Sequence, residues 1–280
     1  SDGRTQVLPL SQMANPDIVD FALPRADFQG AAYQFAIGLL QTVLTPEDEE
    51  DWAEKYHTPP TENELQMAFD RVAHAFNLTG DGPLFMQDLD PLTDQEATPV
   101  TRLLIDATGR NAEHFVKFSH DAISLEMAAL ALFTLQINAP AGGSGHRVGL
   151  RGGGPLTTLI LPNAEKSALW QKLWLNIINQ EALDDSWKIK KEDLINGRIF
   201  PWLAPTKVSS QAGSEVYQQD VHPLHMFWAM PRRIRLTVCE KAEKCHISGG
   251  VSPFTVKDYV TKNHGANYSG TWIHPLTPYQ

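Results

Sequence analysis

Apolar side chains recur every three to four residues in four stretches of this chain. That spacing places them on one face of a helix. The predicted helices cover residues 28–44, 62–77, 121–137 and 164–181. The second begins at a capping box, because Thr61 and Glu64 stand at the spacing at which each side chain bonds a backbone N–H group of the other. The third is apolar on nearly every side, so we expect it to be buried. Caps for the other three are predicted at Asp27, Asp121 and Asn163.

Strand patterns are shorter and fewer. Residues 7–10, 156–161 and 232–238 are predicted strands, the last because Arg235 and Thr237 alternate with apolar neighbours. The remaining notable stretches are predicted to be irregular: an acidic surface run at 47–51, a long loop at 108–120 and an aromatic stretch at 259–279. Together these elements predict an α+β fold, a mixed globular domain with several helices and small, mostly antiparallel sheets.

The composition indicates a globular protein. Of the 280 residues 42% are hydrophobic, which is enough for a packed core, and no apolar run is long enough to cross a bilayer. The first residues do not resemble a signal peptide, and without an initiating Met we expect further residues before Ser1. Cys239 and Cys245 are too few for a disulfide framework. We therefore expect a cytoplasmic protein with no membrane partner.

Charge is distributed unevenly along the chain. The net charge of −10 argues against a protein that binds nucleic acid over its whole surface. Residues 1–140 hold 7 Lys and Arg against 22 Asp and Glu, whereas residues 141–280 hold 16 against 11. Such asymmetry is typical of a protein with one face for an anionic partner, although a soluble protein with an acidic helical half shows the same pattern.

Residues 139–155 hold the most distinctive chemistry, because glycines recur there between a predicted helix and a predicted strand. Glycine lets the backbone approach another surface, and loop N–H groups can form a concave anion site. Arg147 and Arg151 either add phosphate contacts or pair with a carboxylate or carbonyl. Two interpretations follow. The segment is a loop that contacts a phosphate chain or a nucleic-acid groove, or it is a flexible connection between the helix and the strand. Composition leaves both interpretations open.

Known catalytic and cofactor motifs do not match this chain. No Gly-Lys-Ser/Thr triplet closes a P-loop, and a dinucleotide fingerprint needs a strand before the loop and a helix after it. Ser144 misses the nucleophile-elbow pattern because His146 replaces the last glycine. Cys239, Cys245 and His246 lack the spacing and the fourth ligand of a structural zinc site.

We predict a binding protein without catalytic residues, cofactor or metal. The alternative is an enzyme that binds a nucleotide or phosphate ligand at the Gly-rich loop.

Five stretches, in matching order, resemble one protein family. They are Pro83–Gln87, the segment from Leu103 to Phe115 and Val116, residues 139–145, residues 149–158, and Trp272–Pro275. Residues 149–158 resemble the signature Gly-Leu-Arg-Gly-Gly-x-Pro-x-Thr-Thr of the large subunit (CasA/Cse family) of the type I-E CRISPR Cascade complex. The chain resembles the amino-terminal domain of that subunit over residues 1–280. The family's carboxy-terminal helical bundle would follow Tyr279.

The resemblance implies a non-catalytic role in RNA-guided antiviral defence. Cascade carries a guide RNA, and its large subunit recognises the short protospacer-adjacent motif (PAM) in double-stranded DNA, helps to open the duplex and helps to recruit a helicase–nuclease. Guide pairing reads the target sequence, while protein reads the motif and the DNA shape. The expected partners are therefore the CRISPR guide RNA, target double-stranded DNA, other Cascade subunits and the helicase–nuclease. The family's glutamine wedge between the DNA strands lies beyond residue 280.

The resemblance also implies which residues make these contacts. The family's glycine loop contacts the PAM from the minor groove, and the matching positions are Gly142, Gly143, Ser144 and Gly145. Ser144 stands where the family has glycine. Lys262 matches the family's minor-groove lysine, and Phe115 matches the aromatic residue that engages the 5′ handle of the guide RNA. Because the minor groove mainly distinguishes A·T from G·C, we expect a tolerant PAM preference.

Overall fold

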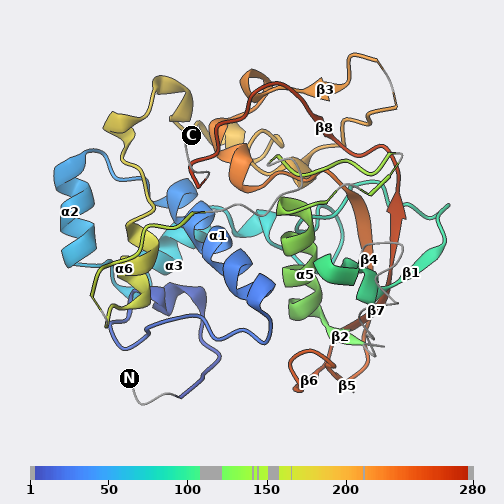
Figure 1. Cartoon of the computed structure of the whole chain (residues 1–280), viewed down its shortest axis with the longest axis horizontal. Coiled ribbons are helices and arrows are strands. Elements are labelled where there is room, and N and C mark those ends of the chain that lie inside the picture. Colours follow the sequence, from blue (N-terminus) through green and yellow to red (C-terminus); the bar gives the residue numbers. More distant parts are fainter. Residues whose placement is uncertain are drawn as a thin grey trace. The chain divides into compact units, whose positions relative to one another are not determined.

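The computed structural model of the chain describes residues 4–107, 122–140, 142–143, 145–150, 158–164, 166–210 and 212–276. The chain forms two compact units (Figure 1). The first comprises Ser1–His74, Thr157–Lys190 and His274–Gln280, and the second comprises Ala75–Leu156 and Lys191–Ile273. Helices and small sheets occur together, so the predicted α+β class is confirmed. No helix in the described ranges is both long enough and apolar enough to cross a bilayer.

The first unit is helical. Its α-helices are α1 (Ala26–Val43), α2 (Glu49–His57), α3 (Glu62–Asp70) and α6 (Leu169–Trp174). α3 begins at the predicted capping box, because Thr61 N–H donates to the Glu64 carboxylate at 2.8 Å and the Thr61 hydroxyl accepts from Glu64 N–H at 3.3 Å. Trp170 and Trp174 of α6 stack with ring centroids 4.9 Å apart. Both indole N–H groups donate to backbone carbonyl groups of α2, which fixes the two helices together.

The second unit is built on a four-stranded sheet with β7 (Thr255–Lys262) at its centre (Figure 1). β4 (Arg233–Cys239) pairs with one edge of β7, and β1 (Ala97–Pro99) and β2 (Ile123–Ser124) pair with the other, all antiparallel. Two smaller strand pairs also lie within the described ranges. β3 (Glu215–Val216) is parallel to β8 (Asn267–Tyr268), and β5 (Glu243–Lys244) is antiparallel to β6 (Val251–Ser252). The predicted small, mostly antiparallel sheets are therefore confirmed.

α5 (Leu125–Ile137) is the main helix of the second unit and is buried on nearly every side, as its sequence predicts. It follows β2 directly, and the Ser124 hydroxyl caps it by accepting from Met127 N–H at 3.3 Å. Packed aromatic rings form the core of this unit: Phe76, Phe85, Phe133, Phe200, Trp202 and Trp228. The Gly-rich segment follows Asn138 at the end of α5, so the first residues of the segment are anchored to a buried helix.

Several predicted helix ends are wrong. α1 begins at Ala26, and Asp27 lies within its first turn, paired with Arg25 at 2.9 Å, rather than capping it. α3 ends at Asp70 instead of residue 77. The cap of α5 is Ser124, and the predicted cap Asp121 lies outside the described residues.

The predicted helix 164–181 is mostly wrong, because only Leu169–Trp174 is α-helical. The Leu169 N–H group donates to the carbonyl of Ile18 at 2.7 Å, so it bonds to a distant segment rather than to a preceding helical turn. Asn163 therefore does not cap the helix. Tertiary contacts of this kind override local propensity.

The strand predictions outside residues 232–238 also fail. Residues 7–9 form no strand, and Leu10–Ala14 is a 3₁₀ helix. Residues 158–161, the described part of the second predicted strand, are not a strand either. The side-chain amide of Asn176 bonds both the N–H and the carbonyl group of Ile160, in place of a neighbouring strand.

Two regular elements lie where irregular chain was predicted. Asp48 caps α2 by accepting from Asp51 N–H at 2.8 Å, so most of the acidic run is the first turn of a helix, where carboxylates are favourable. The stretch 259–279 contains the end of β7 and all of β8. In β7 a bulge opposite Thr237 and Val238 breaks the two-residue alternation, which is why the pattern does not look like a strand.

Candidate functional site

The glycine loop, residues 139–150, leaves α5 and closes back on its own start. Gly149 N–H donates to the carbonyl of Ala139 at 3.0 Å, and His146 N–H donates to the carbonyl of Gly143 at 3.1 Å. A Cβ atom on Gly149 would lie 3.0 Å from the carbonyl oxygen of Ile137, so this closure favours glycine. Gly142 and Gly143 at the tip are exposed, which makes their backbone accessible to a ligand.

The tip of the glycine loop is bonded to the segment that directly follows β7. His264 N–H donates to the carbonyl of Gly145 at 2.9 Å. Gly145 has a φ of +78°, and a Cβ atom there would stand 2.7 Å from the Cβ atom of Asn263. Glycine is therefore required both by the left-handed backbone and by the close approach. The glycine loop and Lys262, distant in sequence, lie close together because of this bond.

Arg232, the residue before β4, holds both arms of the glycine loop. Its guanidinium donates to the carbonyl of Arg147 at 2.7 Å, to Nδ1 of His146 at 3.0 Å and to the carbonyl of Pro140 at 2.5 Å. The side chain of Gln136 from α5 fixes the backbone of Arg232 in turn, since it accepts from the N–H group and donates to the carbonyl, each at 2.9 Å. The loop is thus anchored to the buried helix through one arginine.

The contact with Arg232 keeps His146 neutral. Because the guanidinium donates to Nδ1, that atom must be an acceptor, which leaves the ring proton on Nε2. Burial, together with the charge of Arg232, lowers the pKa of His146. Burial also lowers the pKa of Arg232, although a guanidinium remains a cation at physiological pH. Residues 139–150 contain no acidic side chain, so the loop is locally positive.

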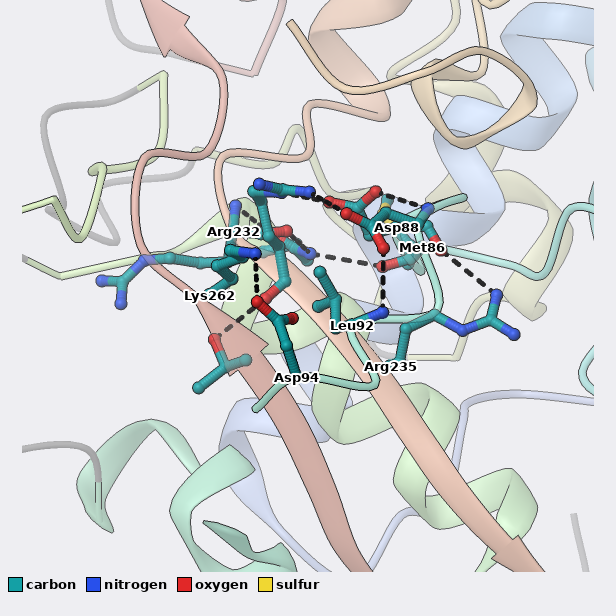
Figure 2. Close-up of polar contacts among 11 residues, drawn as sticks. Met86, Asp88, Leu92, Asp94, Arg232, Arg235 and Lys262 are labelled. Carbon is teal, nitrogen blue, oxygen red and sulfur yellow. Dashed lines mark hydrogen bonds and ion pairs between the residues drawn. The ribbon is translucent and has the colours of Figure 1, made fainter. Parts of the chain in front are cut away.

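Lys262, the last residue of β7, is accessible but paired. Its ammonium group lies 2.7 Å from a carboxylate oxygen of Asp94, and the two face each other in Figure 2. The hydrogen bond from Lys262 lowers the pKa of Asp94, so the carboxylate is charged at neutral pH. The lysine predicted to contact DNA therefore already has an anionic partner in this structure.

Arg147 contacts a neighbouring segment of the same unit. Its guanidinium donates to the Ser209 hydroxyl at 2.8 Å and to the Ser209 carbonyl at 3.2 Å. These contacts support the interpretation of Arg147 as a structural partner of a carbonyl. Its phosphate contact stays a prediction.

Three predicted site residues, Phe115, Ser144 and Arg151, lie outside the described residues. The structure adds three that sequence analysis missed: Gln136, Arg232 and Asp94. Arg232 is visible in the sequence only as the first residue of a predicted strand, and Gln136 only as a polar position in an apolar helix. Asp94 gives no sequence signal at all, because its contact depends on which strands are neighbours.

Metal-binding geometry is absent from the described parts of the chain, where no group of three His, Cys, Asp or Glu side chains could hold an ion. Cys245 is buried and Cys239 is half-buried, and neither forms a disulfide.

Solved structures of CasA proteins share this fold. One crystal structure of Thermus thermophilus CasA matches with a TM-score of 0.63 and 15% identity, covering 98% of this chain and 51% of that chain. Another structure, of Thermus thermophilus CasA (Cse1), matches with a TM-score of 0.64 and 16% identity, covering 98% and 54%. Thermobifida fusca Cse1 matches with a TM-score of 0.60 and 16% identity, covering 93% and 48%. The chain thus spans about half the length of the solved structures it matches.

The sequence itself defines a CRISPR-associated protein. A family model described as CRISPR-associated protein Cse1 matches residues 1–280. The chain therefore belongs to the CRISPR-associated Cse1 family, and the resemblance to the CasA/Cse large subunit is confirmed.

Proposed function

We propose that this chain is the amino-terminal part of the large subunit of a type I-E Cascade complex and recognises the PAM in target double-stranded DNA. The observation that carries the proposal is the hydrogen bond from His264 N–H to the carbonyl of Gly145 at 2.9 Å. It brings an exposed stretch of glycine backbone and an accessible lysine to one place. A narrow minor groove admits thin, positively charged elements of this kind.

The recognition is expected to be tolerant and weak in isolation. The minor groove offers few groups that distinguish one base pair from another. Contacts from the backbone of residues 142–145 and from Lys262 can therefore tell A·T from G·C pairs, but not A·T from T·A or G·C from C·G. The net charge of −10 opposes general attraction to DNA. Other Cascade subunits and the guide RNA therefore have to supply most of the affinity, and guide pairing has to supply the sequence specificity.

The remaining parts of the proposal rest on family membership. Phe115 stacks on an unpaired base of the guide RNA 5′ handle. Phosphate contacts by Arg147 and Arg151 rest instead on their charge beside the glycine loop, and the bonds of Arg147 to Ser209 favour a structural role for that residue. The assembled complex recruits the helicase–nuclease and acts in the cytoplasm, while this subunit performs no catalysis. An enzyme that binds a nucleotide at the glycine loop is not favoured, because the loop follows the helix α5, whereas a dinucleotide fingerprint follows a strand.

A crosslinking experiment tests the proposal directly. The full-length protein is assembled into its guide-loaded complex and mixed with duplexes that carry one photoreactive base inside the PAM. We expect crosslinked peptides from residues 142–147 or 262–264. A duplex with the reactive base one helical turn outside the PAM is the matched control. Crosslinks that never fall in these two segments contradict the proposal.

A further inference from the structure

One acidic loop supplies the counter-charges for two of the basic side chains on one face of the β4–β7 ladder. Arg233 and Lys262 stand directly opposite each other in this ladder, so their side chains project to the same face. Like charges placed opposite one another destabilise a sheet. Residues 88–94 cross this face and supply the counter-charges, as the loop carrying Asp88, Leu92 and Asp94 shows in Figure 2. The contacts are Arg233 to Asp88 at 2.6 Å, Arg233 to Asp90 at 2.9 Å and Lys262 to Asp94 at 2.7 Å.

The two ends of this loop differ sharply in burial. The Arg233 and Asp88 side chains are 8% and 1% exposed, whereas those of Lys262 and Asp94 are 36% and 62% exposed. Separating a buried pair leaves an uncompensated charge and is strongly unfavourable. An exposed pair contributes little and exchanges readily with other ions. The ion pair of Arg233 is therefore expected to persist. An incoming anion can displace the carboxylate that is paired with Lys262.

Strand order explains why Asp94 reaches Lys262. β1 runs antiparallel to β7 with Ala97 opposite Val260. Continuing this register past the end of β1 places Gln95 opposite Lys262, and Asp94 is the next residue. Asp94 lies in the turn shortly before β1, so the pairing of β1 with β7 brings this turn close to Lys262.

We propose that Asp94 competes with DNA for Lys262 and so raises the number of other contacts that a duplex needs to stay bound. This inference rests on the proposed function of Lys262. The ammonium group pairs with the carboxylate when no duplex is bound, and a DNA anion or base acceptor must replace that carboxylate to bind. Every duplex that contacts Lys262 bears the same cost, so Asp94 weakens binding with and without the PAM, and duplexes that offer few other contacts are the first to dissociate.

Asp94→Asn in the full-length protein, assembled with guide RNA and the other subunits, tests the competition. The variant removes the negative charge and keeps the size of the side chain. We expect binding to a duplex without the PAM to tighten about two- to five-fold, which corresponds to about 0.4–1 kcal/mol. Glu96→Gln is the matched control, because Glu96 is an exposed acidic residue on the same segment and forms no ion pair within the described chain. It should change binding less than two-fold.

A double-mutant cycle with Lys262→Ala separates this inference from the proposed function. If Asp94 acts through Lys262, Asp94→Asn has no more effect than Glu96→Gln in the Lys262→Ala background. Equal tightening with and without Lys262, or no tightening beyond that of Glu96→Gln, overturns the inference alone. Lys262→Ala that leaves PAM-dependent binding unchanged contradicts the proposed function, and the inference falls with it.

Discussion

Arg232 and His146 form a hydrogen bond in which the arginine is the donor and a neutral histidine is the acceptor, with Nη1 and Nδ1 3.0 Å apart. The same guanidinium bonds two backbone carbonyl groups on opposite arms of the glycine loop. The loop is therefore shaped by the protein before any ligand binds. This arrangement makes flexible-linker behaviour unnecessary to explain its glycines.

Arg232→Ala should loosen the loop. Two carbonyl groups and the His146 ring nitrogen lose their donor, and partly buried acceptors without partners cost about 1–3 kcal/mol each when water cannot replace the donor. We expect the free energy of unfolding to fall by about 2–3 kcal/mol. Hydrogen exchange of residues 139–150 should accelerate in the same variant. Arg232→Lys retains the charge but lacks the fork of donors, so an exchange rate as slow as in the native protein would contradict the role of the guanidinium geometry.

Alanine substitutions at Gly145 and Gly143 should differ in their effect. Both glycines have positive φ, +78° and +88°, so each alanine incurs a backbone cost of about 1–2 kcal/mol. Only at Gly145 does the added Cβ meet another residue, Asn263, at 2.7 Å, whereas nothing lies within 4 Å at Gly143. Thermal unfolding should show Gly145→Ala to be the less stable variant by about 1–3 kcal/mol. Equal stability would mean that the loop does not approach Asn263 so closely.

The sequence predicts best the elements that depend on local pattern. The capping box at Thr61 and Glu64, the buried helix that ends at Ile137, and the strand that begins near Arg232 all follow from residues close together in the chain. Elements defined by distant partners are not predictable in this way. β7 lies at the centre of the sheet, but its bulge disrupts the alternation, and the helix at Leu169 is shortened by a bond to Ile18.

In the candidate site, too, some residues are indicated by the sequence and others are found only in the structure. The glycine loop and Lys262 are identified from their resemblance to a family, and the structure adds that Gly145 is bonded to the segment after Lys262. The counter-ion Asp94 follows only from the pairing of β1 with β7, which no local pattern encodes. Resemblance to a family therefore indicates candidate ligand contacts, whereas residues that position or neutralise these candidates follow only from the structure.

The stability of the second unit should fall in mild acid because of His225. Its Nδ1 donates to the carbonyl of Arg198, and its Nε2 accepts from the Tyr268 hydroxyl, which in turn accepts from Met230 N–H. Burial lowers the pKa of His225 from 6.5 to about 4. The unfolded chain therefore binds this proton first, and stability present above pH 6.5 is lost as the pH falls from about 6.5 to about 4.

The loss over that window amounts to about 3 kcal/mol. Chemical denaturation at a series of pH values measures it. In His225→Gln the free energy of unfolding should depend less steeply on pH between 6.5 and about 4, whatever the effect of the substitution on stability at neutral pH. His57→Gln is the control for the substitution itself, because His57 is exposed and belongs to the first unit. An unchanged slope in His225→Gln would assign the acid sensitivity to another group.

Phe115→Ala in the full-length protein should weaken retention on the guide-loaded complex. Stacking of an aromatic ring on an unpaired base contributes about 1–3 kcal/mol, so a dissociation constant for the guide-loaded complex about ten-fold higher is expected. Phe115→Tyr keeps the ring and should bind almost normally. Stoichiometric co-purification and unaltered affinity of the alanine variant would exclude the stacking role.

PAM-dependent binding by the complex that carries Lys262→Ala is the most direct test of the proposed function. Lys257→Ala is the matched control, because Lys257 lies on the same strand and is paired with Glu243 at 2.9 Å, away from the glycine loop. Equilibrium binding to duplexes with and without the PAM should show a loss of about ten-fold in PAM preference for Lys262→Ala. The Lys257→Ala complex should retain its preference. A folded Lys262→Ala complex that still prefers the PAM duplex as strongly as the native complex would contradict the role of Lys262 and the glycine loop as one DNA-contacting site.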